Sequence, residues 1–283
     1  MPLEHISDTA RWVAVYRAME SQRKDAIFRD PFAATLAGAR GQEIVEGMAR
    51  GRAMAWAMIV RTAVFDEIIL EKVKGGGIDL VLNLAAGLDA RPWRLSLPPT
   101  LRWIDVDLPE ILQYKTDHLG DVKPACRYET IPVDLTDRAK RQALFAQVGA
   151  QAHRALIVTE GLLIYLPPEQ VSQLAADLHA SPTFRWWLID IASPRLLEML
   201  TKTWGRALEQ ANAPFLFAPA DGTLFFRPFG WEEAEFHSAV DEAQRLRRGF
   251  RGMWLMRLMM RFYSEPRRQE IRRMSGFALL ERY

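Results

Sequence analysis

The stretch that decides the fold is LNLAAGLDARPWRL, residues 82–95. It begins at the end of an apolar run, Ile78–Leu84, which has the composition of a buried strand. The small residues Ala85, Ala86 and Gly87 follow, and they allow the backbone of a strand-to-helix turn to approach a ligand that a larger side chain would block. Many α/β proteins need such a turn, so the stretch indicates a ligand site without identifying the ligand.

Short β-rich runs alternate with helical segments after this turn. The runs are Ile78–Leu84, Leu101–Asp107, Tyr128–Val133, Ala155–Thr159 and Arg185–Ile191. They are largely apolar, and repeated strand–helix units predict a doubly wound α/β fold with a mostly parallel sheet covered by helices on both faces. Two later runs, Trp231–Ser238 and Gly276–Arg282, would bring the sheet to seven strands.

Helical patterns occupy the two ends of the chain. Helical spacing of apolar residues predicts a helix over Ser7–Lys24, and Pro31 starts another. A longer helix covers residues 51–73 and ends at a run of three glycines. We expect one domain over residues 1–283, with a helical cap over 1–50 and a helical insertion over 239–275 that is a candidate lid.

The insertion contains the stretch RLRRGFRGMWLMRLMMRF, residues 245–262. A basic amphipathic helix at a membrane surface or on nucleic acid would have this composition. The other interpretation is a helical pair whose apolar side packs on the domain and whose arginines are solvated. We favour the second, because the apolar positions are nearly continuous and the overall charge is balanced.

The composition argues against several classes of protein. There are 37 basic and 35 acidic side chains, so the net charge of +2 gives no field for binding nucleic acid. A single cysteine, Cys126, and five histidines without HxH or HxxxH spacing give no metal site. No signal-peptide pattern or membrane-spanning run occurs, so we expect a cytoplasmic protein without a membrane partner. The oligomeric state does not follow from the sequence.

Acidic residues mark the carboxyl ends of the predicted strands, where open α/β sheets bind ligands. Asp107 ends the second run, and its two oxygens can accept hydrogen bonds from both hydroxyls of a ribose. After the third run, Asp134 can meet an adenine amino group and Leu135 can lie against the ring. Glu160 ends the fourth run. The turn at residues 85–87 lacks the GxGxxG spacing for a pyrophosphate, which favours S-adenosylmethionine over a nicotinamide cofactor.

With these motifs in place, the sequence resembles the leucine carboxyl methyltransferase family, and within it the bacterial O-methyltransferases of polyketide biosynthesis. The resemblance covers about residues 10 to 195. It rests on five segments: Phe28–Ala33 (FRDPFA), Arg61–Asp66 (RTAVFD), Leu82–Leu95, Trp103–Pro109 (WIDVDLP) and Thr159–Leu166 (TEGLLIYL).

This resemblance implies a Rossmann-like class I methyltransferase fold and S-adenosylmethionine as the cofactor. Its implied cofactor contacts are Arg61 to the carboxylate, Ala85 and Gly87 to the methionine part, Asp107 to the ribose, Asp134 and Leu135 to the adenine, and Glu160 to the amino group. One residue departs from the family pattern, since the family usually has glycine where this chain has Ala85. Alanine adds a methyl group there and restricts positive φ, and whether this weakens cofactor binding does not follow from the sequence.

The expected reaction is methylation of an oxygen on a small molecule, with a carboxylate of a polyketide or other secondary metabolite as the expected acceptor. A carboxylate is ionised at neutral pH and needs no general base. A phenol or other hydroxyl acceptor is the alternative, and it would need a base such as His237 or Glu160. A second alternative is a catalytically inactive cofactor-binding protein, which only Ala85 favours. No catalytic residue is identified, and Glu160 and Tyr165 are candidates for positioning the reactants.

Acceptor specificity should reside in the two helical regions, which topology places over the carboxyl ends of the strands. We expect Trp12, Tyr16, Trp254 and Met256 to line an apolar, adaptable pocket for an aromatic or polyketide-like acid.

Overall fold

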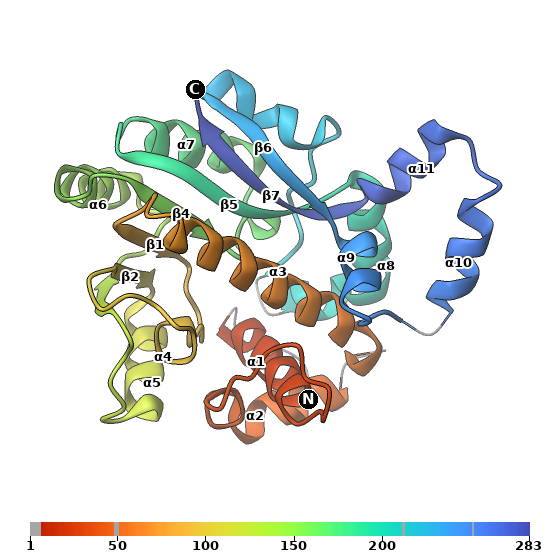
Figure 1. Cartoon of the computed structure of the whole chain (residues 1–283), viewed down its shortest axis with the longest axis horizontal. Helices are drawn as coiled ribbons and strands as arrows, with labels where there is room; N and C mark the ends of the chain where they lie inside the picture. Colours follow the sequence, from red (N-terminus) through yellow and green to blue (C-terminus); the bar gives the residue numbers. More distant parts are fainter. Residues whose placement is uncertain (1–6, 48–50, 211–212, 251) are drawn as a thin grey trace.

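The predicted strands form one seven-stranded sheet in the computed structural model, which describes residues 7–47, 51–210, 213–250 and 252–283 (Figure 1). The strands are β1 (Leu80–Leu84), β2 (Arg102–Asp107), β3 (Arg127–Pro132), β4 (Ala155–Thr159), β5 (Phe184–Ala192), β6 (Trp231–Ser238) and β7 (Ser275–Arg282). Their order is β3-β2-β1-β4-β5-β7-β6, and β7 runs antiparallel to both of its neighbours. The predicted doubly wound, mostly parallel fold is confirmed, with strand ends within two residues of the predicted positions.

Helices flank the sheet and precede it. They are α1 (Ser7–Ser21), α2 (Ala33–Gly47), α3 (Ala55–Lys74), α4 (Arg91–Arg94), α5 (Pro109–Leu119), α6 (Arg138–Gln151), α7 (Pro168–His179), α8 (Pro194–Gln210), α9 (Ala239–Arg245), α10 (Met253–Met260) and α11 (Glu265–Arg272). Short 3-10 helices, η1 to η3, cover Gly51–Met54, Leu163–Tyr165 and Gly222–Phe229. Helix α8 and η3 lie in a stretch for which the sequence patterns gave no prediction.

Alternate residues of the central strands pack against helices on opposite faces of the sheet. Leu82 and Ile157 belong to the core that includes residues of α6 and α7. Val81 and Leu156, one position earlier on the same strands, belong to the core that includes residues of α3 and α9. Both faces are therefore buried, and this explains why the central strands are largely apolar.

The two edge strands differ from the central ones. Most side chains of β3 are exposed, and Glu232 and Glu235 of β6 are polar residues on an open edge. The prediction of a largely apolar strand was wrong for β3, because a terminal strand of a sheet is less covered by helices and has a free side.

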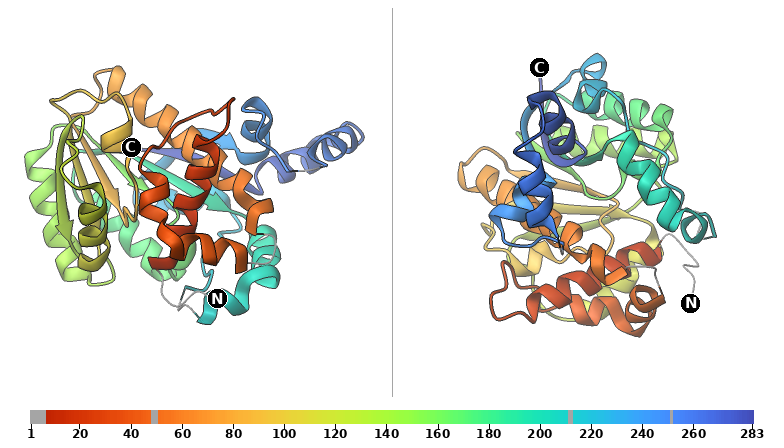
Figure 2. Two further views of the ribbon diagram at one scale, coloured as in Figure 1. Left: turned by 90° about the horizontal axis from the view of Figure 1, so that it is seen from below. Right: turned by 90° about the vertical axis from the view of Figure 1, so that its right-hand side faces the viewer.

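Helices α1 and α2 pack on the β1–α4 turn and on the first part of α3 (Figures 1 and 2). Arg17 of α1 donates a hydrogen bond from Nη2 to the carbonyl of Leu88, at 2.5 Å. The Cβ of Ala10 would lie 3.2 Å from any Cβ added to Gly87, so α1 lies directly against the turn. The expected cap over residues 1–50 includes residues 1–6 and 48–50, which lie outside the described residues.

The insertion between β6 and β7 contains α9, α10 and α11, and α10 and α11 extend away from the sheet in Figures 1 and 2. The expected packing of its apolar side on the domain is confirmed only in part, since Leu246, Phe250 and Met256 pack against the core that includes α3. Met253 and Met260 are buried, but six large apolar side chains among the described residues of the insertion are exposed: Trp254, Leu255, Leu258, Met259, Phe262 and Tyr263. Arg245, Arg247 and Arg261 are exposed, as expected. Arg248 differs, because it is buried and forms hydrogen bonds with both carboxylate oxygens of Glu20 in α1.

Candidate functional site

A cavity of about 2040 Å³ lies at the carboxyl ends of the parallel strands. Residues of α1, α3 and α8 and of the α9–α10 loop complete its wall. All eight residues proposed from the sequence for cofactor binding or positioning line it: Arg61, Ala85, Gly87, Asp107, Asp134, Leu135, Glu160 and Tyr165. The fold thus brings together residues that are up to 104 positions apart in the chain, from Arg61 to Tyr165.

The turn after β1 has a backbone conformation that favours glycine at two positions. Gly87 has φ of +51° and Ala85 has φ of +52°. For a residue with a Cβ, the left-handed conformation costs roughly 1–2 kcal/mol. The departure from glycine at Ala85 therefore introduces strain into the part of the turn that faces the cavity.

Asp107 is held at the end of β2 by two backbone amides. Its Oδ2 accepts from the Gly87 amide at 2.6 Å, and its Oδ1 accepts from the Leu108 amide at 2.7 Å. Burial raises the pKa of Asp107 despite these bonds. Each carboxylate oxygen has a second lone pair, so Asp107 can still accept a hydrogen bond at each oxygen from a ligand in the cavity.

Asp105, two residues earlier on the same strand, has a structural role. It is fully buried and accepts hydrogen bonds from Lys115 Nζ at 2.5 Å, Tyr128 Oη at 2.8 Å and Trp103 Nε1 at 2.8 Å. It is not among the residues that line the cavity. Of the two strand-end carboxylates, Asp107 is the one available to a ligand.

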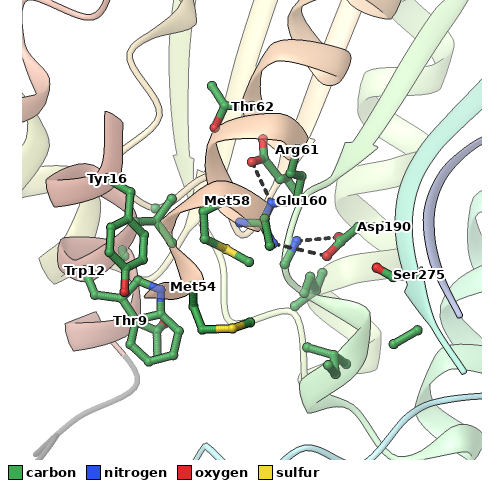
Figure 3. Close-up of a pocket in the computed structure, with 18 of the residues that line it drawn as sticks. Thr9, Trp12, Tyr16, Met54, Met58, Arg61, Thr62, Glu160, Asp190 and Ser275 are labelled. Atoms are coloured by element: carbon green, nitrogen blue, oxygen red, sulfur yellow. Dashed lines mark hydrogen bonds and ion pairs between the residues drawn. The ribbon is translucent and has the colours of Figure 1, made fainter. Parts of the chain in front are cut away.

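Arg61, Glu160 and Asp190 form an ion-pair cluster at the ends of β4 and β5 (Figure 3). Arg61 Nε donates to Glu160 Oε1 at 2.9 Å, and Nη1 donates to Asp190 Oδ2 at 3.1 Å. Burial would lower the pKa of Arg61, but Asp190 and Glu160 outweigh burial and raise it. The arginine is therefore a fixed cation that faces the cavity.

Asp190 was not predicted from the sequence as part of the site. Besides binding Arg61, its Oδ1 accepts from the amide of Gly161 at 2.7 Å and so connects the end of β5 to the loop after β4. The available signal was its place as an acidic residue in β5, like Asp107 at the end of β2.

A buried network of charges extends from this cluster beneath the β1–α4 turn. Arg91, which is 2% exposed, contacts Glu160 Oε2 at 2.7 Å, Asp89 Oδ2 at 2.8 Å and Asp66 Oδ1 at 2.6 Å. Arg94 binds both oxygens of the same Asp66 carboxylate. Burial would lower the pKa of Arg91, but Asp89, Glu160 and Asp66 raise it well above the usual range.

The network continues to the N-terminal helices. Arg94 Nε lies 3.8 Å from Asp30 Oδ2, and Arg17 Nε donates to the same oxygen at 2.8 Å. The segments that carried the family resemblance contain Asp30, Asp66, Arg91 and Arg94, but the sequence patterns gave no role to these residues. Their arrangement shows that the resemblance motifs include the charged support beneath the site.

Asp134 and Leu135 lie in the loop after β3. Asp134 Oδ1 accepts from the amide and the hydroxyl of Thr136, at 2.9 and 2.7 Å. Leu135 is partly buried against the core beside α6 and α7. One exposed carboxylate and one apolar side chain therefore lie together at this end of the cavity.

Tyr165 lies on the loop after β4 and packs its ring against Phe215, with ring centroids 5.5 Å apart. Burial raises its pKa to about 12 although Arg61 acts in the opposite direction. Its hydroxyl is hydrogen-bonded to Thr9 of α1. Tyr165 is thus a neutral hydroxyl at physiological pH.

The remainder of the wall is mainly apolar. Trp12, Tyr16 and Met256 line the cavity as expected, whereas Trp254 does not, because it is 69% exposed on the outside of α10. Further apolar lining residues come from five segments: Met54, Trp56, Met58, Met199, Leu200, Trp204, Phe215, Phe217, Phe250, Met274 and Phe277.

His237, which the phenol alternative offered as a base, lies on β6 outside the cavity lining. Its Nδ1 lies 3.3 Å from Glu242 Oε1, and its Nε2 lies 3.5 Å from Glu235 Oε2. The hydrogen bond with Glu242 is the main cause that raises its pKa. The proposed role of His237 as base is therefore wrong.

Two kinds of feature do not occur in the part of the chain that the structure describes. No group of three His, Cys, Asp or Glu side chains is arranged to hold a metal ion. None of the described helices combines the length and the apolar character needed to span a bilayer.

Comparison with known proteins identifies the family. The family model for leucine carboxyl methyltransferase matches residues 10–179. The chain belongs to the leucine carboxyl methyltransferase family. A protein of Mycobacterium avium named "Putative S-adenosyl-L-methionine-dependent methyltransferase" is 32% identical over 240 residues, which are 76% of this chain and 77% of that protein. The predicted family and the predicted cofactor, S-adenosylmethionine, are thus confirmed.

Another relative, from Mycolicibacterium smegmatis and with the same kind of name, is 36% identical over 194 residues. This match spans 62% of each protein, less than two thirds of the relative.

Two solved structures share the fold. A DUF574 family protein of Streptomyces avermitilis has a TM-score of 0.59 at 16% identity, and the match covers 95% of this chain and 97% of that protein. A "putative methyltransferase" of Thermobifida fusca has a TM-score of 0.60 at 15% identity, and the match covers 99% of this chain and 95% of that protein.

Proposed function

We propose that the chain transfers the methyl group of S-adenosylmethionine to a carboxylate oxygen of an apolar small molecule. The observation that carries the proposal is the lack of a suitable general base among the described residues that line the cavity. No histidine or cysteine is among them. Burial would raise the pKa of Glu160, but Arg91 and Arg61 outweigh it and lower the pKa. A weakly basic Glu160 and a neutral Tyr165 favour an acceptor that is already ionised.

The residues present fit S-adenosylmethionine. The hydrogen bonds that Arg61 makes to described carboxylates use Nε and Nη1, which leaves Nη2 for the cofactor carboxylate. The buried hydroxyl of the adjacent Thr62 has no hydrogen-bond partner among the described residues, although it lines the cavity. Two open lone pairs on Asp107 suit the ribose hydroxyls. Ala85 and Gly87 leave room for the methionine part.

The amino group and the adenine of the cofactor also have candidate partners in the cavity. Glu160 would accept from the cofactor amino group through its remaining lone pairs, and Asp134 and Leu135 would meet the adenine. When bound, S-adenosylmethionine supplies a methyl group on a sulfonium that is already a good leaving group. The work left to the protein is positioning, which can account for a large part of the rate of a two-reactant step.

Glu160 and Tyr165 are positioned to orient the reactants. Glu160 is fixed by two arginines, and Tyr165 is fixed by Thr9 and Phe215. Fixed side chains of this kind hold a bound molecule in one geometry. The apolar walls would exclude water from the reacting groups.

The size and composition of the cavity support an acceptor with a substantial apolar body. Its volume of about 2040 Å³ exceeds the roughly 300–1,000 Å³ of common ligand pockets, which leaves space for an acceptor beside the cofactor. Methionine and aromatic side chains line that space and adapt to flat ring systems. We propose an aromatic or polyketide-like acid of secondary metabolism.

Transfer of labelled methyl groups tests the proposal. The purified chain is incubated with methyl-labelled S-adenosylmethionine and with matched aromatic carboxylic acids and phenols. We expect methyl esters from the acids and no aryl ethers. Formation of aryl ethers without esters would contradict the proposed carboxylate acceptor and support a hydroxyl acceptor. Cofactor binding by calorimetry without transfer to any acceptor would support the inactive-protein alternative.

A further inference from the structure

Helix α1 presents one row of polar-tipped side chains to the cavity. Thr9, Trp12 and Tyr16 lie at spacings of three and four residues, which place them on one face of a helix, and all three line the cavity. In the view of Figure 3 they lie opposite the Arg61–Glu160–Asp190 cluster, with Met54 and Met58 between the two sides.

The two outer members of the row have protein partners. Thr9 is hydrogen-bonded to Tyr165, and the Tyr16 hydroxyl donates to the carbonyl of Gly51 at 2.7 Å. The middle member differs. Trp12 is 6% exposed, and its Nε1 has no hydrogen-bond partner among the described residues.

An indole N–H can only donate, so the missing partner of Trp12 must be a hydrogen-bond acceptor. Buried donors without a partner are uncommon, and a donor at a cavity wall can be satisfied by a bound molecule. Arg61 and Glu160, the two labelled residues that suit the cofactor, lie on the other side of Met54 and Met58 in Figure 3, so Trp12 faces a part of the cavity away from them. Trp204, whose ring centroid lies 6.4 Å from that of Trp12, adds an apolar surface beside the indole.

We infer that Trp12 Nε1 donates a hydrogen bond to an oxygen in the body of the methyl acceptor, such as a ring carbonyl. This inference rests on the proposed function and refines its substrate class to oxygenated, largely apolar acids. Trp12 is then a specificity-determining residue, and an acceptor without the oxygen leaves the donor unmatched. A hydrogen bond of ordinary strength corresponds to a preference of roughly five- to tenfold for the oxygenated compound.

The test uses pairs of acids that differ in bridging carbonyl oxygens. One pair is para-benzoylbenzoate and para-benzylbenzoate, and another is anthraquinone carboxylate and anthracene carboxylate. Their binding to the protein loaded with S-adenosylhomocysteine is measured by calorimetry, so that no methyl transfer is needed. We expect the unaltered protein to bind the carbonyl member of each pair more tightly. In Trp12→Phe, the two affinities of each pair should lie within twofold of each other. The affinity for the carbonyl-free member should not fall.

Trp204→Phe is the matched control, because Trp204 is a buried tryptophan of the same wall whose nitrogen is not among the unpartnered atoms. It should retain the preference. A preference that survives in Trp12→Phe overturns the inference, as does equal binding or no binding of both members of every pair by the unaltered protein. If the preference depends on Trp12 but the acids are not methylated, the proposed function fails while the binding inference stands.

Discussion

The two sides of the cavity are built by different means. On the sheet side, Arg61 has two carboxylate partners and Asp107 has two backbone partners. On the helix side, Met54, Met58 and Trp204 are held by apolar packing. Paired buried charges fix one geometry because an unpaired charge is costly, whereas methionine adapts to different shapes. Under the proposed function, the first side would recognise the cofactor rigidly and the second would adapt to the acceptor.

The largest effect should come from breaking the charge network. Arg91→Met removes the cation between Asp66, Asp89 and Glu160 and leaves three buried carboxylates with fewer partners. We expect the free energy of unfolding to fall by about 3–5 kcal/mol, as measured by urea denaturation. The control Arg245→Met removes the pairs that a half-exposed arginine forms with Glu67 and Glu242, and it should cost no more than about 1 kcal/mol. Similar losses in the two variants would contradict the special role of the buried network.

The second effect is a difference in cofactor affinity between a variant on the sheet side of the cavity and a variant on the helix side. Asp107→Ala should weaken S-adenosylmethionine binding by about 2 kcal/mol or more, because hydrogen bonds to a charged group are lost. Calorimetric titration of the cofactor measures this change. Trp12→Phe, on the other side, should leave cofactor affinity within about twofold. Equal weakening in both variants would show that the two sides do not act separately.

The third effect concerns acid stability. Burial would raise the pKa of Asp89, but Arg91 and Arg94 outweigh burial and lower it to about 2. Between that value and the ordinary 3.8, the unfolded chain binds a proton that the folded chain does not, so stability falls as the pH falls through this window. The linked contribution is about 2 kcal/mol.

Asp89→Asn removes this titration. We expect the unfolding free energy of the variant to change less between pH 5 and about pH 2 than that of the unaltered protein, whatever their difference at pH 7. Parallel pH profiles for the two proteins would contradict the assignment to Asp89.

The smallest effect should come from relieving the backbone strain in the β1–α4 turn. Ala85→Gly removes the unfavourable left-handed alanine, but glycine loses more entropy on folding, so we expect a net gain in stability of up to about 1 kcal/mol. Cofactor affinity should rise as well. Ala86→Gly, a few atoms away and without positive φ, should instead destabilise the protein by roughly 0.5–1 kcal/mol. Thermal unfolding with and without the cofactor distinguishes the two, and a loss in both variants would refute the strain at Ala85.

The sequence alone determined the seven strands and the residues at their ends. Strand composition, small turn residues and strand-end acids are local features, so they suffice to place Ala85, Gly87, Asp107 and Glu160 at one edge of the sheet. The family resemblance extended this to Arg61, whose distance from the strands in the chain gives no local signal.

Only the tertiary structure decided how those residues are paired and which others join them. Asp190 meets Arg61 across 129 positions of the chain, and Arg248 meets Glu20 across 228. The same long-range packing placed His237 outside the cavity, left Trp254 exposed and left the nitrogen of Trp12 without a partner among the described residues. Local patterns report which face of a helix or strand is apolar, but a side chain's partners depend on which distant elements pack against it.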